Sequence, residues 1–268
     1  MTNLKCSVAI IGAGAMGGAI AAGLASSGLL APADVRACDH HLDKLSQLQK
    51  QGVTTYEQAS ELLESNPDIV ILAVKPQVLF SLLDKIATKL SGHLVVSIAA
   101  GVTIASLELA LPESRIVRGM PNLPIQVKRG ATALAKGTTA TAQDIELVRS
   151  LFASLGVCEI MREDQLDAEG AVVGCGPAFF ALMVDTLTRA GVRAGLPAKS
   201  LRPMVASTMA GVATQLLEGG EHPRAYMEKV TSPAGTTAEA LKALEPVLME
   251  GSYDAVDAAL ARTRELAS

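Results

Sequence analysis

The first part of the chain carries apolar runs that alternate with segments of helical periodicity. Runs of strand length and largely apolar composition occur at 6–11, 35–38, 68–74, 93–99, 115–119, 131–135 and 157–161. Apolar residues recur at helical spacing at 19–27, 42–51, 58–65, 80–90 and 142–155. Strands with little polar interruption are typical of parallel sheets buried on both faces. The pattern therefore predicts a Rossmann-type, doubly wound and mostly parallel sheet of the α/β class.

The pattern changes near residue 162, after which only helical periodicity remains. We expect helices at 164–173, 178–194, 199–218, 223–229, 236–248 and 255–266. The sequence thus predicts a dinucleotide-binding domain at 1–162 and an all-helical domain at 163–268. Phe179, Met183 and Leu187 share one helix face and are expected to face a core. So many small residues bury little surface alone, which favours a homodimer formed through these helices.

A glycine-rich turn joins the first predicted strand to the first helix. Gly12, Gly14 and Gly17 have the spacing G-x-G-x-x-G, and Asp39 ends the next strand roughly 20 residues later. Gly12 permits a tight turn, Gly14 lets the backbone approach a pyrophosphate, and Gly17 lets the helix pack on the strand. This arrangement favours dinucleotide binding, and a glycine-rich turn in another α/β fold is the alternative.

Small residues follow two further strands, at the sheet edge where open α/β folds bind ligands. These segments are Ala73-Val74-Lys75-Pro76 and Ala99-Ala100-Gly101, against which a flat cofactor can lie. Lys75 can approach a phosphate or ribose, although an exposed loop lysine is equally consistent with the sequence. In the next loop, Pro121 and Pro124 flank Asn122 and can aim its side chain.

A Ser/Thr loop, residues 230–237, precedes a predicted helix. Ser232 before Pro233 fits an N-cap, and Thr236 with Glu239 fits a capping box. Either arrangement leaves backbone N–H groups unpaired at a helix start, which attracts carboxylate or phosphate. An ordinary capped helix without a ligand is the alternative.

Composition narrows the classes of function. The 268 residues carry a net charge of −4, which gives no electrostatic footprint for nucleic acid or an anionic membrane. The apolar stretch at 8–30 is rich in glycine and is better explained as strand, turn and helix than as a signal or membrane segment. We expect no bilayer-spanning stretch elsewhere.

The cysteines and histidines show no disulfide framework and no metal site. Cys6, Cys38, Cys158 and Cys175 are scattered, which favours reduced thiols in a cytoplasmic protein. The four histidines do not form a metal-ligand set. Cys175 stands at a predicted helix start, where a thiol pKa can fall, but a small packing residue is the simpler interpretation. Hydride transfer from a bound nicotinamide is the clearest chemistry.

These motifs resemble those of the pyrroline-5-carboxylate reductases, which make L-proline from 1-pyrroline-5-carboxylate. The resemblance covers essentially the whole chain. It is carried by 72–76, 97–104, 118–122, Glu163-Asp164, 176–179, 190–192, 195–196 and the Ser/Thr loop. It implies a Rossmann domain that binds NADPH or NADH, interlocked helical domains of two subunits, and an active site between one subunit's cofactor and the partner's helices. Decamers built from dimers also occur among such enzymes.

The resemblance implies a set of site residues. Those expected at the cofactor are Ile11, Gly12, Ala13, Gly14, Ala15, Met16, Gly17, Asp39, Ala73, Val74, Lys75, Pro76, Ala99, Ala100, Gly101, Pro121 and Asn122. Those expected at the substrate are Glu163, Lys229, Val230, Ser232, Gly235, Thr236 and Thr237. Thr237 is the implied catalytic residue, with its hydroxyl near the ring nitrogen while hydride goes to C5. No His or Lys is an evident general acid, so the proton comes from solution or through Thr237 and water.

Several positions depart from the pattern of the resembled family. Ala15 stands for an Asn or Gln, Leu123 for a Thr, Cys175 for a Ser, Phe179 for a Tyr and Ala234 for a Gly. Lys229, where a polar amide occurs, adds a cation that can help hold the carboxylate. These changes bear on substrate detail more than on the reaction class.

Cofactor choice and substrate leave alternatives open. Asp39 favours NADH because it would repel a 2′-phosphate, whereas His40 and His41 can offset that charge. Another cyclic imino acid is an alternative substrate. A β-hydroxyacid-dehydrogenase-like enzyme is less consistent, because 164–173 contains no lysine. A non-catalytic NAD(P)-binding protein would have no need of the Ser/Thr loop.

Overall fold

The computed structural model describes residues 4–267, with side chains as far as residue 265. The chain forms two compact units. One holds the residues up to Cys175 together with those from Ala259 onward, and the other holds Gly176–Ala258.

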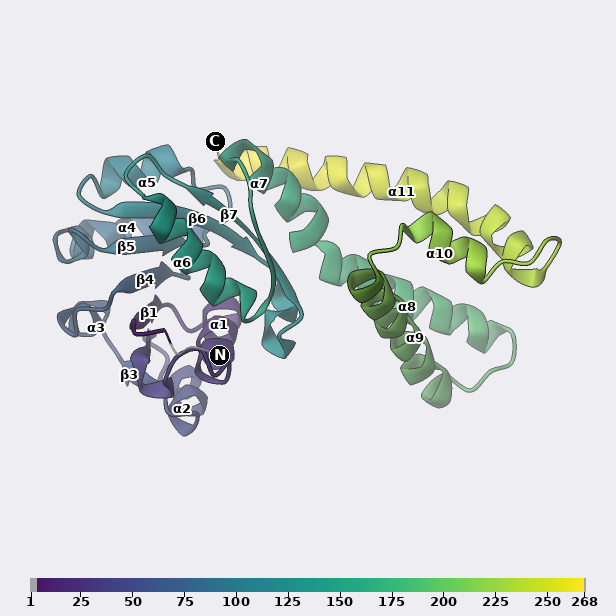
Figure 1. Cartoon of the computed structure of the whole chain (residues 1–268), viewed down its shortest axis with the longest axis horizontal. Coiled ribbons are helices and arrows are strands. Elements are labelled where there is room, and N and C mark those ends of the chain that lie inside the picture. Colours follow the sequence, from purple (N-terminus) through teal and green to yellow (C-terminus); the bar gives the residue numbers. More distant parts are fainter. Residues whose placement is uncertain (1–3, 268) are drawn as a thin grey trace. The chain divides into compact units, whose positions relative to one another are not determined.

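The first unit is built on one eight-stranded sheet (Figure 1). Its strands are β1 (Val8–Ile11), β2 (Val35–Cys38), β3 (Thr54–Tyr56), β4 (Ile69–Leu72), β5 (Leu94–Ser97), β6 (Arg115–Pro121), β7 (Gly130–Lys136) and β8 (Gly156–Ile160). Their order is β3-β2-β1-β4-β5-β6-β7-β8, and all neighbours are parallel except β6 and β7. The first six strands have the order of the dinucleotide-binding fold. The predicted doubly wound, mostly parallel sheet is therefore confirmed.

Helices cover both faces of this sheet. One face packs against α1 (Ala15–Ala25), α2 (Leu42–Lys50) and α6 (Ala142–Ala153). The other packs against α3 (Ala59–Glu64), α4 (Pro76–Ile86), α5 (Ile104–Ala110) and α7 (Glu163–Glu169). Short 3-10 turns lie at Pro32–Asp34, Ala87–Leu90 and Leu123–Val127. Because the central strands are buried on both sides, their ends are fixed in position, and loops can build a site there.

The sequence pattern missed two elements of the first unit. The strand β3 has three residues, one exposed and two half-buried, so it shows no apolar run. The helix α5 has seven residues, too few for a periodic pattern to stand out. Both acquire their structure from their neighbours, β3 by pairing with β2 and α5 by burying Ile104 and Leu107.

The predicted break between the helices 164–173 and 178–194 is wrong. A π-helical turn at Gly170–Gly174 carries α7 directly into α8 (Gly176–Arg193). The amide of Cys175 donates to the carbonyl of Gly170 at 3.0 Å, five residues back. Cys175 therefore lies within a continuous helix, and the expected effect of a helix start on its thiol has no basis in the structure.

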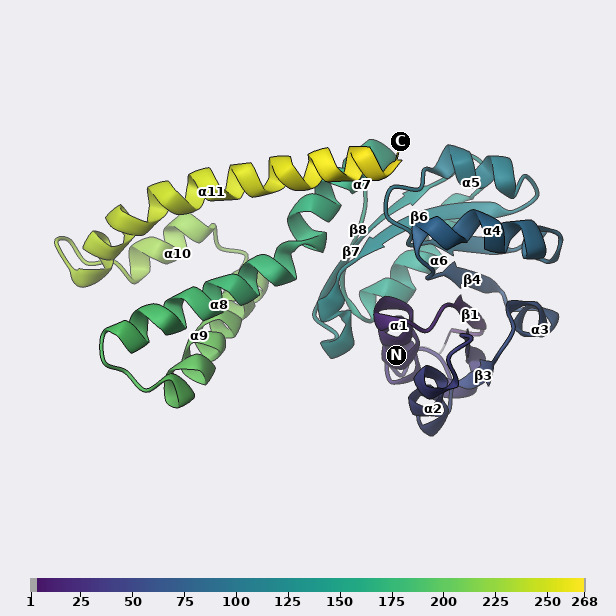
Figure 2. The ribbon, with the colours of Figure 1, turned by 180° about the vertical axis from the view of Figure 1, so that it is seen from behind.

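The second unit is all helical, as predicted (Figure 2). After α8 come α9 (Ala198–Gly219), α10 (Pro223–Lys229) and α11 (Thr236–Ala267), whose last residues belong to the first unit. The separate helices expected at 236–248 and 255–266 are instead this single helix, which continues past Pro246. Pro246 has no N–H and so removes one helical hydrogen bond, a loss that the other hydrogen bonds of this 32-residue helix offset.

The helix α8 exposes apolar side chains that were expected to face a core. Phe179 is 38% and Leu187 43% exposed, whereas Met183 on the same face is half-buried. The expectation that no stretch could cross a bilayer also needs correction. Among the described residues, the helix Glu163–Arg193 passes that test by length and composition, which is weak evidence by itself.

Candidate active site

The glycine turn after β1 has the geometry that its spacing predicts. Gly12 has φ +101°, and a Cβ there would lie 2.7 Å from the carbonyl oxygen of Ala73. A Cβ on Gly17 would lie 1.9 Å from the carbonyl oxygen of Gly12. At Gly14, by contrast, a Cβ would meet no described atom within 4 Å. Gly12 and Gly17 are thus required by packing, and Gly14 leaves the backbone open to a ligand.

The start of α1 is suited to an anion. Gly14 is the N-cap residue, it provides no side-chain cap, and the first turn of this 11-residue helix carries no acidic residue. The first backbone N–H groups of a helix have no partner within it, and the helix dipole makes this end positive. The pyrophosphate of a dinucleotide fits such a position, which is open at Gly14.

Asp39, just after β2, lies against the same turn. One carboxylate oxygen, Oδ2, accepts the Ala13 N–H at 2.9 Å, and Oδ1 accepts the His41 N–H at 2.9 Å. The ammonium of Lys44 lies 3.2 Å from Oδ1. Burial alone would raise the pKa of Asp39, but the hydrogen bonds from His41, Lys44 and Ala13 together hold this pKa at about 2. The side chain is therefore an ionised acceptor at neutral pH.

The carboxyl ends of β4 and β5 bring the other predicted cofactor residues together. The amide of Ala73 donates to the carbonyl of Ile11 at 2.9 Å, so the segment 73–76 begins beside the glycine turn. Ala99 is buried and Gly101 has φ +74° in the loop after β5. Lys75 is exposed and is the N-cap residue of α4. Because β4 and β5 are parallel neighbours, the small residues that follow them lie side by side at the carboxyl ends of the strands.

Asn122 is buried, and its amide group already has structural partners. Its Oδ1 accepts the Ala131 N–H at 2.8 Å, and its Nδ2 donates to the carbonyl of Val173 at 3.1 Å. Val173 belongs to the π turn, so Asn122 joins the end of β6 to that turn. Contact between Asn122 or Pro121 and a cofactor stays a prediction.

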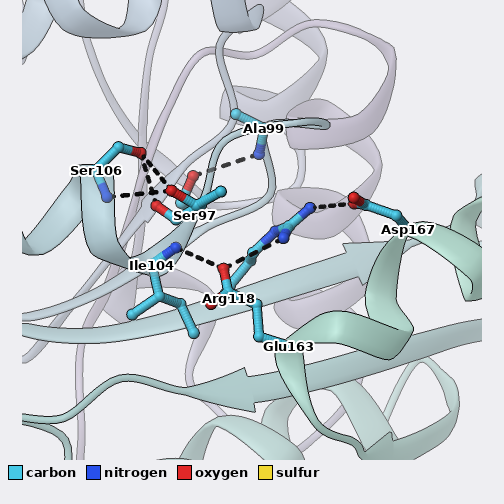
Figure 3. Close-up of polar contacts among 8 residues, drawn as sticks. Ser97, Ala99, Ile104, Ser106, Arg118, Glu163 and Asp167 are labelled. Carbon is cyan, nitrogen blue, oxygen red and sulfur yellow. Dashed lines mark hydrogen bonds and ion pairs between the residues drawn. The ribbon is translucent and has the colours of Figure 1, made fainter. Parts of the chain in front are cut away.

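An ion-pair cluster that sequence reasoning missed surrounds the buried side chain of Arg118 (Figure 3). We call it the Arg118 cluster: Arg118 of β6, Glu163 and Asp167 of α7, and the backbone amide of Ile104. The guanidinium of Arg118 donates to Asp167 Oδ1 at 2.6 Å and to Glu163 Oε1 at 3.3 Å, and the Ile104 N–H donates to Glu163 Oε1 at 2.6 Å. Two acids four residues apart on a helix, with an arginine in an apolar strand, are a signal that could have indicated it.

The Ser/Thr loop, in the second unit, is a turn rather than a capped helix start. The Gly235 N–H donates to the carbonyl of Ser232 at 3.0 Å, and Ala234 between them has φ +56°. The helix α11 begins at Thr236, and Glu239 pairs with Lys242 instead of capping. Both proposed caps are therefore wrong, because Thr236 is already the first residue of α11 and Ser232 lies four residues before it, with the turn at 233–235 between them.

The side chains of the Ser/Thr loop differ in how they are used. The hydroxyls of Ser232, Thr236 and Thr237 have no side-chain hydrogen bond to any described residue. Lys229, just before the loop, pairs with Glu221 at 2.8 Å. The first amides of the 32-residue α11 lack helical partners, as at any helix start. Free amides and hydroxyls together can receive a carboxylate.

Among the described residues, no group of three or more His, Cys, Asp or Glu side chains could hold a metal ion. All four cysteines are free. Burial raises the pKa of Cys38 to about 11 and that of Cys158 to about 12, so neither is a thiolate at neutral pH.

Family models match both parts of this chain. Residues 163–266 match a family model described as pyrroline-5-carboxylate reductase dimerisation, and residues 7–101 match one described as NADP oxidoreductase, coenzyme F420-dependent. Pyrroline-5-carboxylate reductase 2 of Pongo abelii is 37% identical over 274 residues, which cover 98% of this chain and 84% of that relative.

Two solved structures extend the likeness to the fold. A pyrroline-5-carboxylate reductase from Coxiella burnetii is 34% identical, with a TM-score of 0.92 over 99% of this chain and 100% of that one. Plasmodium falciparum pyrroline carboxylate reductase, with NADP bound, is 28% identical, with a TM-score of 0.88 over the full length of both chains. With relatives of this identity along nearly all of its length, the chain belongs to the pyrroline-5-carboxylate reductase family.

Proposed function

We propose that this protein reduces 1-pyrroline-5-carboxylate to L-proline with NADPH or NADH. The observation that supports the proposal is that the chain holds two features, each within its own unit, that suit a dinucleotide and a carboxylate. The first unit has an open glycine turn with an ionised acceptor beside it, and the second has a loop of free hydroxyls at a helix start. The family relation along nearly the whole chain supports the same activity.

The first unit would hold the cofactor. Its residues fit a dinucleotide because Gly14 leaves the backbone open and Asp39 can accept a hydrogen bond from a ribose hydroxyl. The pyrophosphate would meet the amides at the start of α1, and the nicotinamide half would lie against Ala99–Gly101. When bound, NAD(P)H supplies the hydride. The remaining cofactor residues named from the sequence, at 11–17, 73–76 and 121–122, are proposed with these.

The Ser/Thr loop would hold the substrate. Amides at the start of α11 would receive the carboxylate, and the Thr237 hydroxyl would orient the ring nitrogen and pass a proton to it from water. Ser232, Gly235 and Thr236 would complete the loop. Rate acceleration would rest on orientation and on the fixed position of the carboxylate. Glu163 and Lys229 already pair with Arg118 and Glu221, so direct substrate contact by them, or by Val230, stays a prediction.

The match to a dimerisation model indicates association with copies of the same chain. We propose that the helical region 163–268 forms a homodimer and holds the substrate, while the region 1–162 binds the dinucleotide. Exposed apolar residues of α8, such as Phe180 and Leu182, support such an interface. A decamer built from such dimers, and a cytoplasmic location without a nucleic-acid or membrane partner, complete the proposal.

Thr237 provides the sharpest test of the proposed substrate site. We expect Thr237→Ala to lower kcat by about 10²-fold, the usual effect of losing a proton-handling group, while the Kd of NADPH or NADH stays within about twofold. Thr237→Ser keeps the hydroxyl and should recover most of the activity. Steady-state rates with the five-membered and six-membered imino acids, and cofactor titration, measure both. If the wild-type protein reduces 1-pyrroline-5-carboxylate with neither NADPH nor NADH, the proposed function is refuted.

A further inference from the structure

We propose that Glu163 and Arg118 are positioning residues that hold the loop 98–103 in the shape needed by the nicotinamide half of the cofactor. The inference rests on the proposed function, since that function assigns Ala99–Gly101 to the nicotinamide side. It gives Glu163 a different role from the substrate contact expected from the sequence. The Arg118 cluster joins both ends of this loop (Figure 3).

The start of the loop is fixed through the sheet. Ser97, the last residue of β5, pairs in register with Arg118 on β6, and both residues are buried. The Ser97 hydroxyl lies 3.4 Å from the Ala99 N–H, a contact at the limit of a hydrogen bond. The chain therefore leaves β5 at the level of Arg118 and turns at once into the loop. Arg118 is only 2% exposed, so its guanidinium has little freedom to rearrange.

The end of the loop is fixed by Glu163. Ile104 is the first residue of α5, and its N–H has no partner within that helix. Glu163 Oε1 accepts this N–H at 2.6 Å and also lies 3.3 Å from Arg118 Nη1. One carboxylate oxygen thus joins the end of the loop to the residue that is level with its start.

Removing Glu163 would leave two buried donors without a partner. The Ile104 amide would lose its acceptor, and Arg118 would keep only Asp167, on its other nitrogen. The Nε of Arg118 already has no hydrogen-bond partner among the described residues. An unpaired buried donor is costly, and the least costly adjustment is a shift of the loop 98–103 toward water. Because Glu163 Oε1 already accepts from both Ile104 and Arg118, the carboxylate is engaged inside the first unit, which favours a positioning role.

The test compares ligands that do and do not reach this loop. NADH or NADPH carries the nicotinamide ribose, whereas ADP ends at the pyrophosphate and contacts only the glycine turn and the Asp39 side. We expect Glu163→Ala to weaken NADH binding about tenfold and ADP binding by less than about twofold, both by calorimetric titration. Glu163→Gln keeps an acceptor for the Ile104 N–H and should stay within about threefold of wild type. Glu159→Ala, an exposed acid on β8, is the matched control and should change neither affinity.

Each outcome decides one question. Equal weakening of NADH and ADP by Glu163→Ala would show general damage to the domain and would overturn the inference, as would no change in either. If Glu163→Ala does not fold, Arg118→Lys is tested in its place, because one ammonium cannot reach both Glu163 and Asp167. The same loss of NADH binding, with ADP binding kept, is expected of Arg118→Lys. A wild-type protein that binds neither ligand contradicts the proposed function instead, so the two failures are distinguishable.

Discussion

Glu169, the last residue of α7, carries a carboxyl group that the proposed chemistry does not use. It is 9% exposed, and its Oε2 has no hydrogen-bond partner within the described chain. Burial raises the pKa of Glu169 to about 7, with no compensating charge. Of the other acids on the same helix, Glu163 and Asp167 pair with Arg118, and Asp164 pairs with Arg162. Glu169 directly precedes the π turn, so a charge here would act on the segment that carries α7 into α8.

Replacing Glu169 with Gln removes this charge while keeping the shape of the side chain. In the unfolded chain the carboxyl group ionises near its ordinary pKa of 4.5, whereas in the fold it keeps its proton up to about pH 7. The folded state therefore binds more protons between these values, and the wild-type stability falls as the pH rises from 4.5 to 7. The difference between about 7 and 4.5 corresponds to about 3 kcal/mol, at about 1.4 kcal/mol per pH unit.

We expect Glu169→Gln to match the wild type near pH 5 and to be more stable above pH 7, by up to about 3 kcal/mol. Urea unfolding from pH 5 to 8 at one fixed protein concentration measures this difference, because oligomers gain apparent stability with concentration. Glu159→Gln, at an exposed position on β8, is the control and should follow the wild type at every pH. If the stability advantage of Glu169→Gln does not grow with pH, the carboxyl group is not held neutral and the reasoning is wrong.

Three further predictions follow from the geometry. Gly14→Ala should fold with an unchanged Tm, because its Cβ would meet no described atom, but should bind NADH at least about tenfold more weakly. Gly17→Ala should lower the Tm itself, because its Cβ would lie 1.9 Å from the backbone oxygen of Gly12. Asp39→Ser should improve the affinity for NADPH relative to that for NADH by about tenfold, and Lys44→Ala should shift this affinity ratio the other way. If titrations give the same ratio for the wild type and both variants, Asp39 and Lys44 do not decide the choice between the two cofactors. Ala234→Gly should stabilise the protein by about 1 kcal/mol, seen as a higher Tm, because the φ of +56° strains an L-residue.

The sequence predicted well those features that depend on residues close together in the chain. The buried strands ending at Ile11 and Leu72 appeared as apolar runs because a strand covered on both faces needs no polar residues. The roles of Gly12 and Gly17 followed from a fixed spacing, since a tight turn and a helix packed on a strand constrain backbone only locally. The change from alternating to purely helical pattern gave the second, helical part of the molecule.

Features decided by neighbours distant in the chain were missed or mistaken. The continuous helix through Cys175 depends on a π turn. A carbonyl of this turn, that of Val173, accepts a hydrogen bond at 3.1 Å from the side chain of Asn122, which lies about 50 residues earlier in the chain. The cap at Ser232 failed because a turn with a positive φ at Ala234 was as compatible with the local residues as a helix start. Local propensity does not choose between such alternatives, because their energies differ by less than one tertiary contact.

The site divides in the same way. The sequence by itself determined the glycine turn, the acid at Asp39 and the Ser/Thr loop, since each is a short motif with its own chemistry. Only the tertiary structure decided that Asp39 accepts the Ala13 N–H, and that Glu163 pairs with Arg118 and accepts the Ile104 N–H. Hydrogen bonds between residues 26 to 59 positions apart leave no periodicity in a sequence, because they arise only when the sheet brings its strand ends together.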